Sequence, residues 1–366
     1  MIKAMLLLNY CQSYDVRLWQ HFEETGLEPS ALADGGPSLW ESIGINERNR
    51  DLMVKALSSD WIDRELETCE KLGVRLVTCR DAIYPANLLD MKDAPIILYI
   101  RGARFSLPGR VVGVVGTRRC SAYAGKVARE FGKNAALRGW SVVSGGAKGI
   151  DGFAHVGCLD ENGLTAAVLG TGVDVTYPSE HRGLFERVRE TGALFSEYPL
   201  GTGGESWRFP KRNRIIAGIS SRTVVVEAPH KSGAMITARH AAEAGREVWA
   251  VPGRIGDPLC RGSNRLIFDG AFPLIDMETF FGTPDPQKNL FYDDFEGQGG
   301  AKKEVLKLTG IEKTLVALLT NHGDRTIDNL AGEAKMSAAE VFKAMSILSL
   351  RGVVFSSGPG RYRLVD

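Results

Sequence analysis

The stretch Val111–Asp151, VVGVVGTRRCSAYAGKVAREFGKNAALRGWSVVSGGAKGID, predicts the fold of this chain. Val111–Val115 and Ser141–Val143 are short apolar runs, and the helix-length segment Ala122–Leu137 lies between them. Apolar runs without alternation are typical of parallel strands that are covered on both faces. The stretch therefore predicts a strand, a helix and a second parallel strand, the repeating unit of a doubly wound sheet.

The same alternation of apolar runs and helix-length segments extends in both directions from this stretch. The further strands that we expect are Val74–Thr78, Ile96–Ile100, Leu164–Leu169, Ala193–Ser196, Thr223–Glu227 and Glu247–Val251. The further helices are Gly152–Glu161, Leu184–Glu190, Arg212–Ile219 and Ala234–Ala244. This order predicts an α/β fold over residues 66–283, an extended Rossmann-like, doubly wound sheet that is mostly parallel.

A small helical segment precedes the predicted α/β domain. Within residues 1–65, apolar residues recur at helical spacing in Val16–Glu24, Leu39–Ile43 and Asn46–Ala56. This pattern predicts a helical domain of the SAM-like or helix-hairpin-helix-like type. A packing cap and a binding module are both open as its role.

The C-terminal part is predicted to be a separate unit. Residues 284–309 are largely polar and aperiodic, which is typical of a linker. Within residues 310–366, three helix-length segments and two short strands predict a winged-helix-like domain. These are Ile311–Thr320, Thr326–Ala334, Ser337–Ser349, Val353–Ser356 and Arg361–Val365. Ser337–Leu350 carries one cation, Lys343, so duplex DNA and a protein are both open as its partner.

The composition excludes several classes of protein. The 366 residues include 45 basic and 44 acidic side chains, so a basic tail is excluded as a mode of binding. Six scattered cysteines without a C-x-x-C pair, and six histidines without metal-ligand spacing, predict no bound metal and no disulfide framework. The apolar run Met5–Leu8 is too short for a signal sequence or a membrane span. We therefore expect a cytoplasmic protein with no membrane partner.

Positive charge is concentrated in two segments despite this overall balance. Residues 205–240 carry seven Lys or Arg and two acids, and residues 101–133 carry eight basic residues and one acid. Such local clusters are what a protein needs to hold a polyanion.

The loops that follow the predicted strands contain groups that bind anions. In an open α/β sheet, ligands bind outside the carboxyl ends of the strands. After Val115, Gly116 allows close backbone approach, Arg118 and Arg119 offer forked donors, and Ser121 is placed to cap the next helix.

Two further loops are rich in glycine. Residues 144–149 contain three glycines and Lys148, which predicts a cradle of backbone amides for phosphate, and Asp151 is expected to cap the helix that follows. After Leu169, residues 170–174 form another glycine-rich turn, in which Asp174 is expected to orient a cation or a loop. Neither loop has the spacing of a P-loop or of the G-x-G-x-x-G fingerprint.

Lys211, Arg212 and Arg214 fall in the first turns of a predicted helix after Pro210. Cations at a helix N-terminus oppose the helix dipole, so their placement there indicates an anion between them. Farther on, Ser232 and Gly233 begin another helix and provide a further set of free amides, and Glu227 is expected to pair with an arginine.

The glycine-containing loops and the two basic clusters together offer more phosphate-binding groups than one mononucleotide needs. A groove that holds successive phosphates accounts for them better. Aromatic residues in these loops are placed to stack bases, as in proteins that bind single strands. They are Tyr177, Tyr198, Trp207 and Phe209. Packing beside Pro178 is an equal alternative for Tyr177. No G-x-S-x-G or H-E-x-x-H motif is present, and we expect no catalytic residue and no cofactor.

The ordered motifs of residues 75–275 resemble those of the DprA/Smf family of DNA-processing proteins. The matching segments are Val115–Arg118, Ser121-x-Tyr123, Val143–Asp151, Gly170–Asp174, Ser196–Pro199, Phe209–Ile216, Val226–Ala228, Ser232–Ala238 and Val251–Gly253. Two positions depart from the family pattern. Thr117 stands where serine is common, and Ala124 stands where glycine is common.

The resemblance implies a protein that binds single-stranded DNA and loads the RecA recombinase onto it, as in natural transformation. It also implies a homodimer, and a single-strand-binding protein as a further partner. The family's DNA contacts carry over to Arg118, Lys148, Lys211, Arg212 and Arg214, and to the amides of Gly145, Gly146, Ser232 and Gly233.

Sixteen residues make up the DNA- or phosphate-binding site that we expect. They are Gly116, Thr117, Arg118, Arg119, Ser121, Gly145, Gly146, Lys148, Phe209, Lys211, Arg212, Asn213, Arg214, Ser232, Gly233 and Thr237.

Two alternative functions belong to other classes. A nucleotide-processing enzyme of the lysine-decarboxylase-like phosphoribohydrolase group has the motif P-G-G-x-G-T-x-x-E, and the nearest segment here, Glu227–Gly233, lacks its glycine pair and its glutamate. A dinucleotide dehydrogenase lacks support because G-x-G-x-x-G is absent.

Overall fold

The computed structural model describes residues 1–11, 15–107, 109–282, 310–322, 325–350, 353–358 and 361–364. The chain forms two compact units, Met1–Asp293 and Asp294–Asp366. Within the described ranges, no helix has the length and apolar character that a membrane crossing requires.

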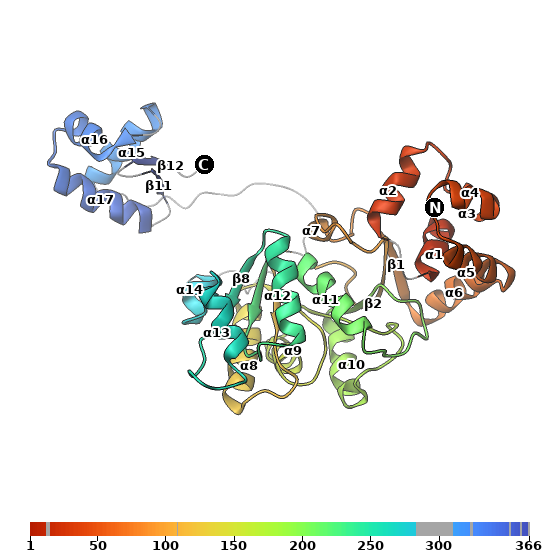
Figure 1. The fold of residues 1–366 in the computed structure, drawn as a ribbon. Coiled ribbons are helices and arrows are strands. Elements are labelled where there is room, and N and C mark those ends of the chain that lie inside the picture. The colour runs from red at the N-terminus through yellow and green to blue at the C-terminus, as the bar shows by residue number, and fades with distance from the viewer. Residues whose placement is uncertain are drawn as a thin grey trace. The chain divides into compact units, whose positions relative to one another are not determined.

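A nine-stranded sheet is the centre of the first unit (Figure 1). Its strands, in spatial order, are β1 (Val74–Thr78), β2 (Ile97–Gly102), β6 (Ala193–Ser196), β5 (Thr165–Val168), β4 (Ser141–Ser144), β3 (Val111–Val115), β7 (Arg222–Val225), β8 (Glu247–Ala250) and β9 (Phe272–Pro273). The seven strands from β6 to β9 are parallel, and β1 and β2 extend the sheet in antiparallel pairing. The predicted extended, doubly wound, mostly parallel sheet is confirmed.

The order of the strands creates a switch point between β3 and β7. The chain runs from β3 outward through β4 and β5 to β6, and then returns to place β7 on the other side of β3. The helices that follow β3 and β7 therefore diverge, which leaves a crevice at the carboxyl ends of these two strands.

Helices cover both faces of the sheet. The helices are α8 (Ala122–Leu137), α9 (Ile150–Asp160), α10 (Arg182–Thr191), α11 (Arg208–Ile219), α12 (Gly233–Glu243), α13 (Arg261–Phe268) and α14 (Met277–Phe281), with the short α7 (Ala86–Leu89) and the 3-10 turn η1 (Ser179–His181). One apolar core contains side chains of α8, α9 and α14, and the other contains side chains of α10, α11 and α12. The two groups of helices thus bury opposite faces of the same strands, which is why those strands lack alternation.

Close packing of α8 on α9 depends on a glycine. A Cβ at Gly132 would lie 2.2 Å from the carbonyl oxygen of Ala154, so a larger residue there would force the two helices apart. The predicted bounds of α8 agree with the structure. By contrast, α11 begins at Arg208, four residues before the predicted start at Arg212.

The N-terminal region is helical, as expected, and shares its core with the sheet. It contains α1 (Ile2–Tyr10), α2 (Val16–Glu24), α3 (Ala31–Asp34), α4 (Gly36–Ser42), α5 (Glu47–Ser58) and α6 (Trp61–Leu72). The sequence analysis missed α1 and α6, and the domain boundary that it placed after residue 65 falls inside α6. Buried Trp19 and Phe22 belong to the same core cluster as Leu98 and Ile100 of β2.

Among the residues that the structure describes, the second unit contains three helices and a small antiparallel sheet. The elements are α15 (Gly310–His322), β10 (Arg325–Thr326), α16 (Ile327–Ala334), α17 (Ala338–Leu350), β11 (Val354–Gly358) and β12 (Arg361–Leu364), with sheet order β10-β12-β11. The three helices and the two-stranded ribbon match the sequence expectation. The domain limits and the winged-helix assignment of residues 310–366 stay predictions, and the predicted linker 284–309 lies outside the described residues.

Candidate functional site

A cavity of about 550 Å³ opens at the crevice between β3 and β7. A smaller one of about 80 Å³ adjoins it, and Arg118, Ala147, Phe209 and Arg212 line both. Of the sixteen expected residues, ten line the large cavity: Gly116, Thr117, Arg118, Arg119, Phe209, Arg212, Asn213, Ser232, Gly233 and Thr237. Gly145 and Lys148 line the small one. Ser121, Gly146, Lys211 and Arg214 line neither.

The loop after β3 is fixed by a carboxylate from the neighbouring strand. Ser121 caps α8 as expected, because its Oγ accepts a hydrogen bond from the N–H of Ala124. The buried carboxylate of Glu227 accepts hydrogen bonds from Ser121 N at 2.8 Å and Ser121 Oγ at 2.7 Å. Glu227 was expected to pair with an arginine. It binds Ser121 instead, since its position just after β7 places it beside the loop that follows β3.

This arrangement leaves two cations of the β3 loop exposed at the cavity. Arg118 and Arg119 both line it, and neither forms an ion pair with any residue that the structure describes. The guanidinium of Arg118 lies over the ring of Phe209, 5.3 Å from its centroid, which holds the charge at the mouth of the cavity. Exposed cations without a carboxylate partner beside a cavity favour an anionic ligand.

The glycine-rich loop after β4 holds a carboxylate of its own. Asp151 Oδ2 accepts hydrogen bonds from Gly145 N at 3.1 Å and Ala147 N at 3.3 Å, while Gly149 is the N-cap of α9. Burial raises the pKa of the Asp151 carboxyl, and the charge of Arg212 opposes that rise. The expected capping role of Asp151 is therefore wrong. Two amides of the predicted phosphate cradle are already occupied by Asp151, and Lys148 is paired with Glu180 at 2.5 Å.

Arg212 forms part of the floor of the cavity. Its side chain is buried, and Nη1 donates to the carbonyl oxygens of Gly145, at 2.7 Å, and of Val168. Nε donates to Asn213 Oδ1, and no described residue accepts a hydrogen bond from Nη2. Burial lowers the pKa of Arg212 to about 10, so it keeps its charge at neutral pH. Arg212 is thus a fixed cation in the floor of the cavity.

Lys211 and Arg214 lie on another face of α11. Arg214 is 4% exposed, its Nη2 is 2.5 Å from Glu197 Oε2, and its Nε is 3.3 Å from Asp93. Lys211 Nζ lies 4.0 Å from Glu197, and burial lowers its pKa. Arg214 is neutralised by carboxylates in the interior, which contradicts the expectation that it contacts the ligand, whereas Lys211 lines neither cavity and its contact with a ligand stays a prediction.

Helical periodicity explains the division of α11. Phe209, Arg212, Asn213 and Ile216, at spacings of three and four residues, line the cavity. Lys211 and Arg214 are three residues apart and therefore share a different face. This period was readable from the sequence, but the prediction rested on the helix dipole and not on the face of the helix that each cation occupies.

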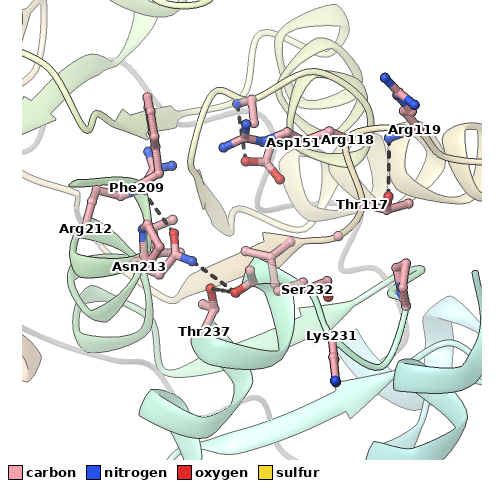
Figure 2. A pocket seen from close by; sticks show the side chains of 18 of the residues that line it. Thr117, Arg118, Arg119, Asp151, Phe209, Arg212, Asn213, Lys231, Ser232 and Thr237 are labelled. Carbon is pink, nitrogen blue, oxygen red and sulfur yellow. Dashed lines mark hydrogen bonds between the residues drawn. The ribbon is translucent and has the colours of Figure 1, made fainter. Parts of the chain in front are cut away.

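The N-terminus of α12 provides a further wall of the cavity, beside α11 (Figure 2). Ser232 is the N-cap residue by its backbone, and its buried Oγ has no hydrogen-bond partner among the residues that the structure describes. Asn213 Nδ2 donates to the carbonyl oxygen of Gly233 at 3.0 Å, which joins α11 to α12. Free amides at a helix start bind anions.

The cavity also contains residues that were not among the sixteen. Exposed Lys231 precedes α12, and its place between β7 and a helix start could have identified it. Ser206 and Leu259 also line the cavity, and no pattern in the sequence marks them.

The four aromatic residues do not share one environment. Tyr177 is exposed, and its ring centroid is 5.1 Å from that of Phe209 at an angle of 30°. Trp207 is exposed, whereas Tyr198 is fully buried and cannot stack on a base without a rearrangement. The expected stacking role of Tyr198 is therefore wrong.

Fold and site define the class of protein. A doubly wound α/β sheet carries, at its switch point, a cavity lined by cations without acidic partners among the described residues, a buried arginine and the amides of a helix start, which are the features of anion-binding α/β proteins. Where the structure describes the chain, no three His, Cys, Asp or Glu side chains are grouped to hold a metal ion.

The chain belongs to the DNA recombination-mediator protein A family, whose family model matches residues 75–283. Protein Smf of Escherichia coli is 36% identical over 312 residues, which are 82% of this chain and 80% of that protein. DNA processing protein DprA of Bacillus subtilis is 37% identical over 281 residues, 73% of this chain and 94% of that protein. The resemblance stated from the sequence motifs is confirmed.

The solved structures that are similar to this chain include two DNA processing proteins. DNA processing protein A of Streptococcus pneumoniae superposes with a TM-score of 0.64 at 30% identity, over 78% of this chain and 96% of that one. DNA processing protein A of Helicobacter pylori, described for its single-stranded DNA binding mode, gives a TM-score of 0.52 at 26% identity, over 57% and 94%.

Proposed function

We propose that this chain binds single-stranded DNA in the cavity between the carboxyl ends of β3 and β7 and acts as a recombination mediator. The observation that carries the proposal is the set of exposed cations without carboxylate partners among the described residues, Arg118, Arg119 and Lys231, around one cavity. The amides at the start of α12 and the unpartnered Oγ of Ser232 add neutral donors for phosphate oxygens.

A polynucleotide suits the site better than a mononucleotide. The two adjoining cavities extend from the α12 side past Arg118 to Tyr177, which places phosphate donors and aromatic rings in succession. Proteins that bind single strands without sequence preference combine these two features. The buried, internally bonded Arg212 supplies charge without a side chain that must be ordered on binding.

As a mediator, the chain would load RecA onto the bound strand during DNA uptake and displace a single-strand-binding protein. Both come from membership of the family. RecA ATP hydrolysis on single strands coated with that binding protein should rise when this chain is added. No change in the hydrolysis rate would leave strand binding without a mediator function.

A homodimer is the proposed assembly. Phe268, Phe272 and Ile275, at the edge formed by α13 and β9, are 79%, 50% and 69% exposed. Apolar side chains grouped on an edge strand favour pairing with a second copy, because burial of that surface removes it from water. The mass in solution, measured by light scattering, should be that of two chains and should fall to one chain in Phe268→Asp. A wild-type protein with the mass of one chain would contradict the proposed homodimer.

Titration of the chain against three ligands tests the main proposal. Oligo-dT should bind more tightly than a duplex of equal length and far more tightly than thymidine monophosphate. Its affinity should fall with salt, with a log–log slope of about −0.7 for each phosphate neutralised. A flat salt response would contradict a phosphate groove, and release of the base from a nucleoside monophosphate would favour the phosphoribohydrolase alternative.

A further inference from the structure

Trp207 is an exposed tryptophan beside the cavity. Its side chain is 48% exposed, whereas Trp19, Trp40, Trp140 and Trp249 are 1% to 7% exposed. It directly precedes α11, and Ser206 and Phe209 on either side of it line the cavity. Trp207 is thus next along the chain to two residues of the proposed DNA groove, although it lines neither cavity itself, and its indole is not used in the core.

The orientation of this indole is fixed by its neighbours. Nε1 donates a hydrogen bond to Glu205 Oε2 at 2.6 Å. The guanidinium of Arg208 lies 5.0 Å from the ring centroid, and the ring of Tyr198 meets the indole at 89° with 6.4 Å between centroids. One face of the ring is thus covered by the cation while the side chain keeps nearly half of its surface in solvent.

Glu205, an acid in the basic segment 205–240, helps to fix the ring of Trp207. Glu205 uses one oxygen for Trp207 Nε1, and its other oxygen lies 3.1 Å from Arg208 Nη2. Arg208 is itself 9% exposed and donates to the carbonyl oxygen of Gly203 at 2.6 Å. Glu205 therefore holds the ring and the cation together. A ring that is ordered before the ligand arrives loses less conformational entropy on binding.

We propose that Trp207 is a stacking platform for a base of the single strand just outside the cavity. The inference rests on the proposed function, since it assigns a second subsite to the same ligand. The base stacks on the face of the indole that is turned away from Arg208, where every base offers the same flat apolar surface. The subsite adds affinity but no sequence preference, and its contribution is insensitive to salt because it neutralises no phosphate.

Two variants of Trp207 test the subsite against oligo-dT. Tryptophan emission of the wild type should be quenched by the oligonucleotide, and Trp207→Phe should lose that quenching while it keeps most of the affinity. Trp207→Ala should weaken binding by about 5-fold to 150-fold, the range that loss of one stacking ring gives, with the salt slope unchanged. Phe153→Ala, which truncates a half-exposed ring of α9 that lines neither cavity, is the matched control and should leave the affinity unaltered.

The outcomes separate this inference from the proposed function. If Trp207→Ala binds oligo-dT as tightly as the wild type, or if the quenching persists in Trp207→Phe, the subsite is overturned and the proposed groove is unaffected. Absence of wild-type binding overturns both. If Trp207→Ala melts early, the quenching of the conservative Trp207→Phe still decides the question.

Discussion

The loop after β3 carries two cations and the first turns of α11 carry four, but the two regions use them differently. Arg118 and Arg119 of the loop are exposed at the cavity and have no acidic partner in the described part of the chain. Lys211 and Arg214 of α11 face Glu197, and Arg214 is buried against it. The first pair is available to a ligand, whereas Arg214 holds the fold together.

The positions of the carboxylates produce this difference. Glu197 directly follows β6 and points at α11, so it neutralises the cations there. Glu227 lies close to the end of β7 and could have done the same for the β3 loop, but the backbone and hydroxyl of Ser121 occupy it. A basic segment is thus a ligand site only where the neighbouring strand ends leave its charges without counterions.

Replacement of Arg214 should have the largest effect and tests the internal half of the comparison. Arg214→Ala leaves the buried Glu197 without its closest partner, which costs about 3–5 kcal/mol in the free energy of unfolding. Urea denaturation measures this loss. A variant with wild-type stability and lost affinity for single strands would place Arg214 in the groove instead.

Replacement of both arginines of the loop after β3 tests the other half of the comparison, the exposed cations at the cavity. The double variant Arg118→Ala with Arg119→Ala loses two phosphate contacts, and each contact multiplies the binding constant by the salt concentration raised to the power of about −0.7. The log–log salt slope should therefore fall in magnitude by about 1.4. At 0.1 M salt, the affinity for oligo-dT should fall by about 25-fold. The free energy of unfolding should change by less than about 0.5 kcal/mol. Arg187→Ala, an exposed arginine of α10 that is paired with Asp160, is the control and should bind as wild type. A large loss of stability in the double variant would contradict the distinction.

A smaller effect concerns the closed interior beneath the groove. His155 is fully buried, its Nδ1 is 2.7 Å from Thr165 Oγ1, and burial lowers its pKa from 6.5 to about 3. The unfolded chain therefore gains a proton below pH 6.5 that the folded chain does not take up. Stability that is present above pH 6.5 should fall toward pH 3, by up to about 1.4 kcal/mol per pH unit from this group.

Unfolding free energies at several pH values between 7.5 and 5 measure this effect. His155→Gln should flatten the acid side of the profile, because its side chain takes up no proton in either state. Equal slopes for the wild type and the variant would show that His155 is accessible to water and that the floor beneath the groove is open.

Most of the fold could be predicted because it depends on local pattern. Strands that are buried on both faces appear as apolar runs, and α8 follows from the Ser121 cap and the apolar spacing over Ala122–Leu137. Helices α1 and α6 were missed: α1 carries an almost continuous apolar run, Met5–Leu8, which has no helical period because its whole circumference is buried in a shared core.

The site was predictable by location but not by the role of each residue. Ten of the sixteen expected residues line the large cavity because the carboxyl ends of parallel strands meet at one edge. The roles of Asp151, Arg214 and Tyr198 depend on contacts that no pattern in the sequence shows. Asp151 fills amides that looked free, Arg214 meets an acid seventeen positions earlier, and Tyr198 is covered by the fold.

The sequence by itself determined the α/β architecture, the family and the edge of the sheet where the cavity lies, because these follow from periodicity and from the order of motifs along the chain. Tertiary structure alone decided which cations face the cavity. A guanidinium is a binding group in contact with solvent and a structural group beside a buried carboxylate, and only the packing of β6 and β7 against their neighbouring loops determines which environment each arginine has.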